Sequence, residues 1–491
     1  MYIANRAFGD LRKFIAFYCP TCHIPTVVGN ADRPLYLHEQ TETFYTLINI
    51  IKSPIMQYLK TLIPFCFLTI LSFSTFSQTA TKDKEIKVNQ QRIENRIFEL
   101  AKIGKDSKGK GNRVAYTKGD IEGRTWFIDQ MKKAGLEVTI DFAGNIIGKR
   151  KGKDASLKPI AFGSHIDMVP DGGNYDGCVG SVSGLEIMEI LNENNIVTNH
   201  PLELIIFSDE EGSLLGSMAL AGHLNQERLK VVSQSGLTIS EGIKAIGGNP
   251  DSIPSVIRKK GDLSAFIELH IEQGGILDRG NIQIGVVEGI VGIEDWEVTV
   301  EGFANHAGTT PMNLRQDALL SAAKLIIAVN EVIIGREGRQ VGTVGKISAQ
   351  PGAYNVVPGK VILGLEIRDL SHDNIWELFR EIEKRAAAIA ASSGTTITFN
   401  NQSLGATPAL TNKSIQDKIV QSAKALGFTY KYMQSGAGHD SQNMALITPI
   451  GMIFVPSAGG ISHSPKEFTK AIDMANGANV LLQTILALDK Q

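Results

Sequence analysis

The sequence predicts an α/β protein with two structural domains. The larger domain is built on a mixed sheet flanked by helices, and an α+β sandwich is inserted into it. Short apolar runs bounded by turn residues, such as 202–207 and 450–455, are typical of buried strands. An apolar helical pattern at 182–191 lies between two such runs, which gives the order strand, helix, strand.

The inserted domain, expected at 286–400, has a different pattern of apolar and polar residues. Residues 296–302 alternate between apolar and polar side chains, 317–329 is amphipathic, and 361–368 alternates again. A helix at 374–391 and a strand at 395–399 complete a compact α+β unit. The larger domain is then discontinuous and is expected at 85–285 and 401–491.

Composition limits the classes of partner. With 491 residues the chain is too long for one ordinary core. Its 49 Lys and Arg residues balance 51 Asp and Glu residues, so no basic surface for nucleic acid is expected. We therefore expect a small-molecule ligand, no nucleic-acid partner and no stable membrane partner.

The N-terminal region resembles an export signal. In 56–77 one lysine precedes an apolar run, 61–73, that is too short to span a bilayer, and small residues follow it. This predicts a signal peptide beginning near Met56 and a secreted or periplasmic protein; an uncleaved anchor or a buried helix is the alternative. Residues 1–55 are then an upstream extension, as from a misassigned start codon. The Cys19 and Cys22 pair lacks a second ligand pair, so no function is assigned to it.

Polar side chains follow the predicted strands at the points where the strands end. In open α/β sheets the carboxyl ends of strands form the ligand crevice, so we expect these segments to meet. The residues are His165 and Asp167, the pair Glu210-Glu211, His270 and His463, together with Asp176 in a loop that opens a helix.

Three histidines and several carboxylates in one place predict a pair of divalent cations, because buried carboxylates otherwise repel one another. Two metals need a bridging carboxylate, and Asp176 is the natural one. In the Glu210-Glu211 pair one carboxylate can ligate while its neighbour acts as general base. Asp167 faces the same way as His165 and is expected to form a hydrogen bond with its imidazole and fix its tautomer.

Seven motifs, in order along the chain, together resemble a known family. They are Gly-Ser-His165-Ile-Asp167, Asp176-Gly, Asp-Glu210-Glu211-Gly-Ser, Leu-His270-Ile-Glu-Gln273-Gly, Asn-His306-Ala-Gly-Thr-Thr-Pro-Met312, Gly-Ala-Gly-His439-Asp440 and Gly-Gly-Ile-Ser-His463-Ser-Pro. From Asn89 to the C-terminus the chain is similar to the hydantoinase/carbamoylase branch of the dinuclear zinc aminoacylase and carboxypeptidase G superfamily. Members include N-carbamoyl-L-amino acid hydrolases, β-ureidopropionases and allantoate amidohydrolases.

The resemblance implies a role for each matched residue. One metal is held by His165, Asp176 and His270, and the other by Asp176, Glu211 and His463, with Glu210 as general base and acid. Asn355 and Arg368 bind the substrate carboxylate, and Gln273 and His439 lie in the pocket. His306 comes from the lid domain of the partner subunit of a homodimer and polarises the scissile carbonyl. In place of the family's Arg-Phe after Glu-Glu-Gly-Ser, this chain has Leu214-Leu215, which leaves substrate identity open.

The expected reaction is metal-dependent hydrolysis of the ureido or amide C–N bond of an N-carbamoyl amino acid or similar ureido acid. Allantoate amidohydrolase is the alternative, followed by a dipeptidase or aminoacyl-amide hydrolase; a metal-dependent binding protein would not need Glu210. Zn, Mn and Co all suit the ligand set. Structural roles are expected for Cys178 and for His200, His223 and His372. His439 and Asp440 have the pocket floor as an alternative, and Arg368 has pairing with Glu366 or Asp369.

Overall fold

The computed structural model describes residues 86–490, apart from 106–108, 110 and 404–405. The chain divides into two units, Met1–Glu85 and Ile86–Gln491. The expected upstream extension (1–55), the signal peptide (56–77) and the Cys19 and Cys22 pair all lie outside the described residues. They stay predictions.

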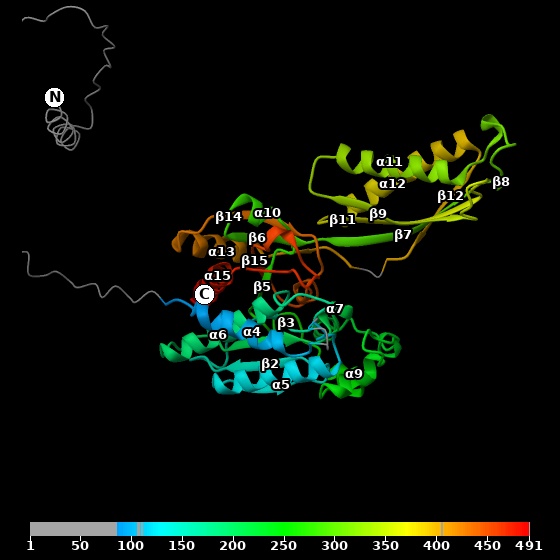
Figure 1. Cartoon of the computed structure of the whole chain (residues 1–491). Coiled ribbons are helices and arrows are strands. Elements are labelled where there is room, and N and C mark those ends of the chain that lie inside the picture. The colour runs from blue at the N-terminus through cyan, green and yellow to red at the C-terminus, as the bar shows by residue number, and fades with distance from the viewer. Residues whose placement is uncertain (1–85, 106–108, 110, 404–405, 491) are drawn as a thin grey trace, which may run out of the picture. The chain divides into compact units, whose positions relative to one another are not determined.

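A nine-stranded mixed sheet forms the core of the larger domain (Figure 1), which confirms the predicted α/β class. Its order is β1-β2-β4-β3-β5-β15-β6-β13, with β14 beside β6. The neighbours β4, β3, β5 and β15 run parallel, so their carboxyl ends lie at one edge. The strands are β1 Glu137–Ile140, β2 Ile146–Arg150, β3 Ile160–His165, β4 Leu202–Phe207, β5 Ala265–Ile271, β6 Ile284–Ile290, β13 Ala409–Leu410, β14 Tyr430–Ser435 and β15 Ile450–Val455.

Helices cover both faces of this sheet. Successive strand residues point to opposite faces, and in β4 both sets are apolar: Leu204 joins one core and Ile205 the other. The first core takes in α4 Gln90–Lys102, α5 Lys118–Lys133, α6 Cys178–Glu193, α13 Lys413–Ala425 and α15 Ala471–Leu488. The second core takes in α8 Leu215–Leu220 and α14 Asp440–Met444. Shorter helices are α7 Glu210–Ser213, α9 Ile239–Ala245 and α10 Ile276–Gly280.

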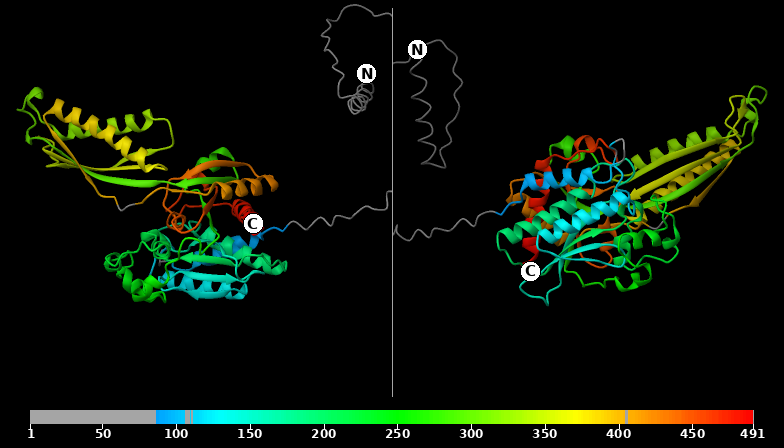
Figure 2. Two further views of the ribbon diagram at one scale, coloured as in Figure 1. Left: turned by 180° about the vertical axis from the view of Figure 1, so that it is seen from behind. Right: turned by 60° about the horizontal axis from the view of Figure 1, so that its bottom comes forward.

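The smaller domain is a four-stranded antiparallel sheet covered by two long helices, as Figures 1 and 2 show. Its strand order is β12-β7-β11-β9. Strands β8 and β10, from the same part of the chain, form a separate two-stranded sheet. Ser371 caps the start of the longer helix and Gly394, at φ 65°, ends it. The elements are β7 Gly292–Glu301, β8 Asn305–His306, α11 Ala318–Gly335, β9 Val341–Gln350, β10 Val356–Val357, β11 Lys360–Asp369, α12 His372–Ser393 and β12 Thr396–Asn401.

The chain passes between the two sheets at Val291. Residue 286, where the sequence predicts the inserted domain to begin, lies inside β6 of the large sheet. The apolar pattern continues from β6 into β7 without a turn signal, so the sequence places the crossing too early. Near this junction Arg339 forms an ion pair with Glu288 at 2.6 Å.

A close approach between α6 and β5 sets the position of the loop that precedes α6. A Cβ atom at Gly180 would lie 2.0 Å from the carbonyl oxygen of Leu269. Only glycine therefore allows the helix to lie this near the strand. The same contact fixes the distance between His270 on β5 and Asp176, which precedes the helix.

We expect Gly180→Ala to destabilise the protein by about 1–3 kcal/mol, because the added methyl must push α6 away from β5. Urea unfolding of the purified variant should show a lower midpoint. Gly335→Ala is the control, since no heavy atom lies within 4 Å of a Cβ at that position. Equal midpoints for the Gly180→Ala variant and the wild type would contradict the close-packing argument.

Candidate metal centre

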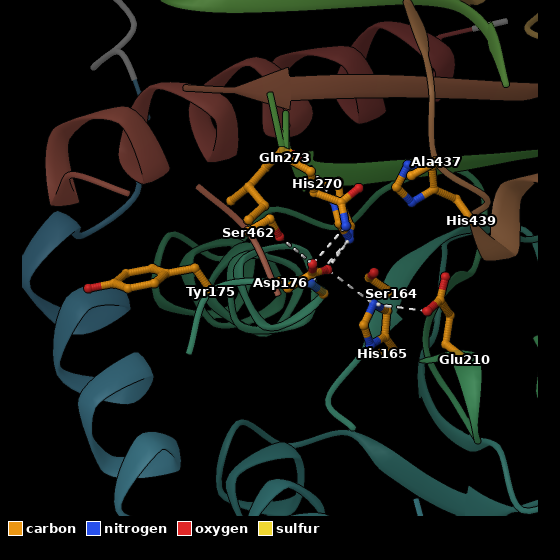
Figure 3. Close-up of polar contacts among 12 residues, drawn as sticks. Ser164, His165, Tyr175, Asp176, Glu210, His270, Gln273, Ala437, His439 and Ser462 are labelled. Atoms are coloured by element: carbon orange, nitrogen blue, oxygen red, sulfur yellow. Dashed lines mark hydrogen bonds and ion pairs between the residues drawn. The ribbon is translucent and has the colours of Figure 1, made fainter. Parts of the chain in front are cut away.

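The strand ends do bring the predicted polar residues together (Figure 3). His165 is the last residue of β3, and His270 lies near the end of β5. Glu210 begins α7 three residues after the end of β4, and Asp176 lies in the loop before α6. His463 follows β15 and completes the cluster. Five segments that are far apart in the sequence therefore meet at the carboxyl edge of the sheet.

Asp176 lies between two groups of side chains. Its Oδ1 is 3.1 Å from His270 Nε2 and 3.6 Å from His165 Nε2. Its Oδ2 is 3.3 Å from His463 Nε2, which in turn is 3.4 Å from Glu211 Oε2. Each group forms a set of three donor atoms within 4.8 Å of one another. The two oxygens of one carboxylate thus face two separate candidate metal positions.

The tautomers of the two buried histidines follow from their other ring nitrogens. His270 Nδ1 is 2.9 Å from the carbonyl oxygen of Ile271, and His165 Nδ1 is 3.1 Å from that of Asp167. A carbonyl oxygen only accepts, so each Nδ1 donates and each neutral ring keeps a lone pair on Nε2. Asp167 therefore meets the His165 ring, as the sequence analysis expects, through its backbone carbonyl, and its Oδ1 lies 3.6 Å from His165 Nδ1. The Asp167 carboxylate also accepts from the backbone N–H groups of Glu210 and Glu211, at 3.4 and 3.2 Å.

This donor set fits a divalent cation. His165 Nε2 and His270 Nε2 lie 3.6 and 3.1 Å from Asp176 Oδ1, so one cation could take all three atoms as ligands; His270 Nε2 also accepts the backbone N–H of Gly177 at 3.1 Å. Metal-binding imidazoles commonly donate their other N–H to a backbone carbonyl, as both rings do here. Glu211 Oε1 is buried without a hydrogen-bond partner among the described residues. Imidazole with carboxylate is the combination that zinc and related ions prefer.

A further layer of side chains holds Asp176 in place, and the sequence analysis missed its main member. Ser462 Oγ donates to Asp176 Oδ2 at 2.9 Å and also contacts Glu467 Oε2 at 2.9 Å. Glu467 Oε1 accepts the backbone N–H groups of Tyr175 and Asp176, at 2.9 and 3.1 Å. Glu467 stands four residues after His463, and this proximity was the only sequence signal. Gln273, expected in the substrate pocket, donates from Nε2 to Asp176 Oδ2 at 2.7 Å.

The crowding of carboxylates raises the pKa values of the two adjacent glutamates. Burial raises the pKa of Glu210 well above its ordinary range; His165 opposes this, and the Asp440 and Glu211 carboxylates add to it. Burial and the Asp176 carboxylate raise the pKa of Glu211 to about 7. Without a metal, protons are therefore held where cations would otherwise balance the charge.

The carboxylates of the site in turn raise the pKa values of two of its histidines. Burial lowers the pKa of His165, but the Glu210 carboxylate and hydrogen bonds outweigh it and leave the pKa well above the ordinary value. The hydrogen bond to Asp176 raises the pKa of His463 to about 9. Burial opposes ionisation of Asp176, but His270 and the other imidazoles hold its pKa well below the usual range. Asp176 is thus the anion around which the site is organised.

His439 is fully buried and packs edge-on against His270, with ring centroids 4.5 Å apart. Its Nε2 lies 2.8 Å from Ser435 Oγ. Burial, and then the neighbouring His270, lower its pKa well below the ordinary value. This neutral ring supports a ligand-bearing strand. Glu268, near both histidines, is already occupied by Ser164 and Ser441 hydroxyl groups, at 2.8 and 2.6 Å.

Three predicted site residues lie in the smaller domain. His306 and Asn355 are exposed and lie close together, since Ala307 N–H donates to the carbonyl oxygen of Asn355 at 2.9 Å. No hydrogen bond or ion pair within the described ranges joins either residue to the metal centre. Arg368 lies at the junction, where its Nη1 donates to the carbonyl oxygen of Gly436 at 2.6 Å. Its Nε and Nη2 donate to Glu366, at 2.7 and 2.9 Å.

Comparisons with known proteins agree with this geometry. An N-carbamoyl-L-amino acid amidohydrolase of Geobacillus stearothermophilus is 37% identical over 82% of this chain and 99% of its own length. A ureidoglycolate hydrolase of Arabidopsis thaliana is also 37% identical, over 82% of this chain and 87% of its own. The crystal structure of an amidase of the hydantoinase/carbamoylase family from Burkholderia multivorans superposes with a TM-score of 0.77 at 34% identity, covering 83% of this chain and 99% of that one.

The family model described as peptidase family M20/M25/M40 matches residues 161–487. That range contains each of the five candidate ligands, the whole smaller domain and most of the larger one. The resemblance expected from the seven motifs is therefore confirmed, and the chain belongs to peptidase family M20/M25/M40, as a hydrolase of amide C–N bonds.

Proposed function

We propose that this protein uses two divalent metal ions to hydrolyse the ureido C–N bond of an N-carbamoyl amino acid. The observation that carries the proposal is the position of Asp176, whose two oxygens face different imidazole groups. Glu210, which belongs to neither ligand set, lies 3.5 Å from His165 Nε2. The similarity to an N-carbamoyl-L-amino acid amidohydrolase supports the substrate class.

Two ligand sets share the bridging carboxylate. His165, Asp176 and His270 would hold one ion, and Asp176, Glu211 and His463 the other. When bound, Zn, Mn or Co in such a site supplies Lewis acidity that polarises a carbonyl group and makes water more acidic. The bonds from Ser462 and Gln273 keep Asp176 in the orientation that serves both sets.

Glu210 is the proposed general base and acid. It is buried beside the ligand cluster, and Asp167 fixes its backbone N–H, so its carboxylate is aimed from a constrained first turn of α7. It takes a proton from the attacking water and returns it to the departing nitrogen. One water adds to the carbonyl carbon, the C–N bond breaks, and the carbamate product decomposes, so the overall products are the amino acid, ammonia and carbon dioxide.

Arg368 is the proposed partner of the substrate carboxylate. Glu366 occupies its Nε and one Nη2 proton, and Gly436 takes one Nη1 proton. One N–H on each terminal nitrogen has no other partner among the described residues, and a carboxylate can accept from both. Asn355 lies beside His306, far along β11 from Arg368, so it would contribute an amide to the same carboxylate from a partner subunit.

His306 is the proposed donor to the scissile carbonyl, supplied by a partner subunit. Its Nδ1 accepts the backbone N–H groups of Gly308 and Thr309, at 3.0 and 3.2 Å. The neutral ring therefore carries its proton on Nε2, which leaves a hydrogen-bond donor facing solvent. A carbonyl oxygen that gains negative charge needs such a donor.

The smaller domain carries the surface expected for a homodimer. On α11, Leu320, Ile327 and Ile334 are exposed and spaced by seven residues, so they form one apolar stripe. β9 is an edge strand of its sheet and exposes Ile347. We propose that two copies pair through β9 and α11 about a two-fold axis, which lets each subunit supply His306 to the other.

A second candidate is hydrolysis of ureidoglycolate, favoured by the equally similar plant relative. Allantoate, the alternative expected from the sequence, has the same ureido group. Both compounds would use the same metal centre and Glu210. They differ from an N-carbamoyl amino acid only in the groups attached beyond the ureido nitrogen.

The reaction is tested by ammonia release from the metal-loaded enzyme. We expect N-carbamoyl amino acids to give a higher kcat/KM than ureidoglycolate, allantoate or dipeptides. Chelation should abolish the activity, and Zn, Mn or Co should restore it. Faster cleavage of a dipeptide than of any ureido acid would overturn the proposal.

Glu210→Gln should keep both metal ions and lose about 10²-fold or more in kcat, because the side chain transfers protons and does not ligate. Metal analysis and steady-state kinetics measure the two effects separately. The comparison variant is Asp176→Ala, which should lose metal because one carboxylate serves both positions. A Glu210→Gln enzyme with normal kcat would refute the assignment.

His306→Ala should lower kcat by on the order of 10²-fold while metal content stays normal. Mixing this variant with Glu210→Gln then tests the shared site, because one site of the heterodimer contains both native groups. Activity should return once differently tagged subunits have exchanged. If exchange is confirmed by co-purification of both tags and no activity appears, His306 does not act across the dimer.

A further inference from the structure

A cavity of about 490 Å³ opens beside the metal centre, and no role has yet been given to it. Two of its lining residues, Asp167 and Glu211, belong to the metal-centre cluster. The opposite wall is the segment 225–239, which includes Val231 and Val232. A volume of this size is typical of a small-molecule site.

Most polar groups on the floor of this cavity already have partners. The Asp167 oxygens accept the backbone N–H groups that begin α7. Asp209 Oδ2 accepts from Ser213 Oγ at 2.8 Å, and Arg228 Nη1 donates to the carbonyl oxygen of Ser213 at 3.3 Å. The one unpartnered buried oxygen of this floor among the described residues is Glu211 Oε1. The Asp167 and Asp209 carboxylates therefore have little capacity left to recognise a polar ligand, whereas Arg228 keeps N–H groups without a hydrogen-bond partner among the described residues.

The polar side chains of the remaining lining are those of Asn225, Glu227, Ser233 and Gln234 on the outer segment, and the buried side is apolar. Val114, Met168 and Ile239 form the buried side, while Val231 and Val232 stand at the mouth with 54% and 63% of their surface exposed. The wall is a closed turn rather than a loose loop. Ile239 N–H donates to the carbonyl oxygen of Val231 at 2.9 Å, and Val232 pairs with Thr238.

We propose that this cavity receives the side chain of the substrate, and that the substrate is an N-carbamoyl amino acid with a large apolar side chain. The inference rests on the proposed function. In such a substrate the side chain begins three bonds from the carbonyl carbon, so a ureido group at Glu211 places it at the mouth of the cavity. Allantoate and ureidoglycolate carry polar groups on that carbon, and these would lose hydration against the apolar wall.

The test compares kcat/KM for two substrates in the wild type and in variants of two exposed valines. We expect kcat/KM for ammonia release from N-carbamoyl-leucine to exceed that from N-carbamoylglycine by about 10-fold or more, because an apolar pocket rewards each added methylene. Val232→Asp should remove most of this preference and change N-carbamoylglycine hydrolysis less than about two-fold. Val197→Asp is the matched control, since Val197 is 47% exposed and does not line the cavity. It should leave both rates unchanged.

The possible outcomes distinguish a failure of the cavity assignment from a failure of the proposed function. Equal kcat/KM for the glycine and leucine substrates, or an equal loss of both in Val232→Asp, overturns the cavity assignment and leaves ureido hydrolysis standing. A higher kcat/KM for allantoate or ureidoglycolate than for N-carbamoyl-leucine does the same. If no ureido acid releases ammonia, the proposed function fails, and the cavity assignment fails with it.

Discussion

The rest of the structure depends on one electrostatic constraint: several carboxylates are buried together at the edge of a sheet. Asp167, Asp176, Glu210 and Asp440 are all buried. Such a cluster is stable only when cations or protons balance it and backbone N–H groups solvate it. The parallel strands deliver imidazoles to one side, and the first turn of α7 delivers N–H groups to Asp167. The fold thus places imidazoles and backbone N–H groups at the same edge of the sheet as the buried carboxylates, in an arrangement that cations would complete.

The candidate metal ligands and most of the proposed substrate-binding residues lie in different domains. The ligands sit on strand ends and on a helix start fixed by close packing at Gly180, which suits groups whose geometry must not change. The residues proposed to polarise the carbonyl and to bind the substrate carboxylate lie in the smaller domain, which has its own core. Arg368 connects them, since it lies on β11 and contacts Gly436 in the larger domain. The side chain that is proposed to bind the substrate carboxylate therefore also joins the two domains.

The sequence predicted those features that depend on local pattern. Strands β4 and β15 have the expected bounds, and His165, His270 and Asp176 meet as the strand-end argument requires. It did not predict features that depend on contacts between distant segments. The Asp167 carboxylate turns to the α7 backbone because α7 begins there, and the bond of Glu467 to the Asp176 backbone joins residues 291 positions apart. The sequence also did not predict the cavity lined by 231–239, because the hydrophobic periodicity of a sequence does not show which loop packs against which strand.

The two candidate ligand sets differ in how far water can reach them. His165 and His270 are 1% exposed, whereas the side chain of His463 is 48% exposed. A ligand that rotates into solvent without disturbing a core opens a route for ion exchange, while the two buried rings offer none. The buried position should therefore retain its ion through purification and the outer one equilibrate with the medium. In a compartment of variable metal supply, the identity of the outer ion would follow the surroundings, and one folded protein would exist in several metal forms.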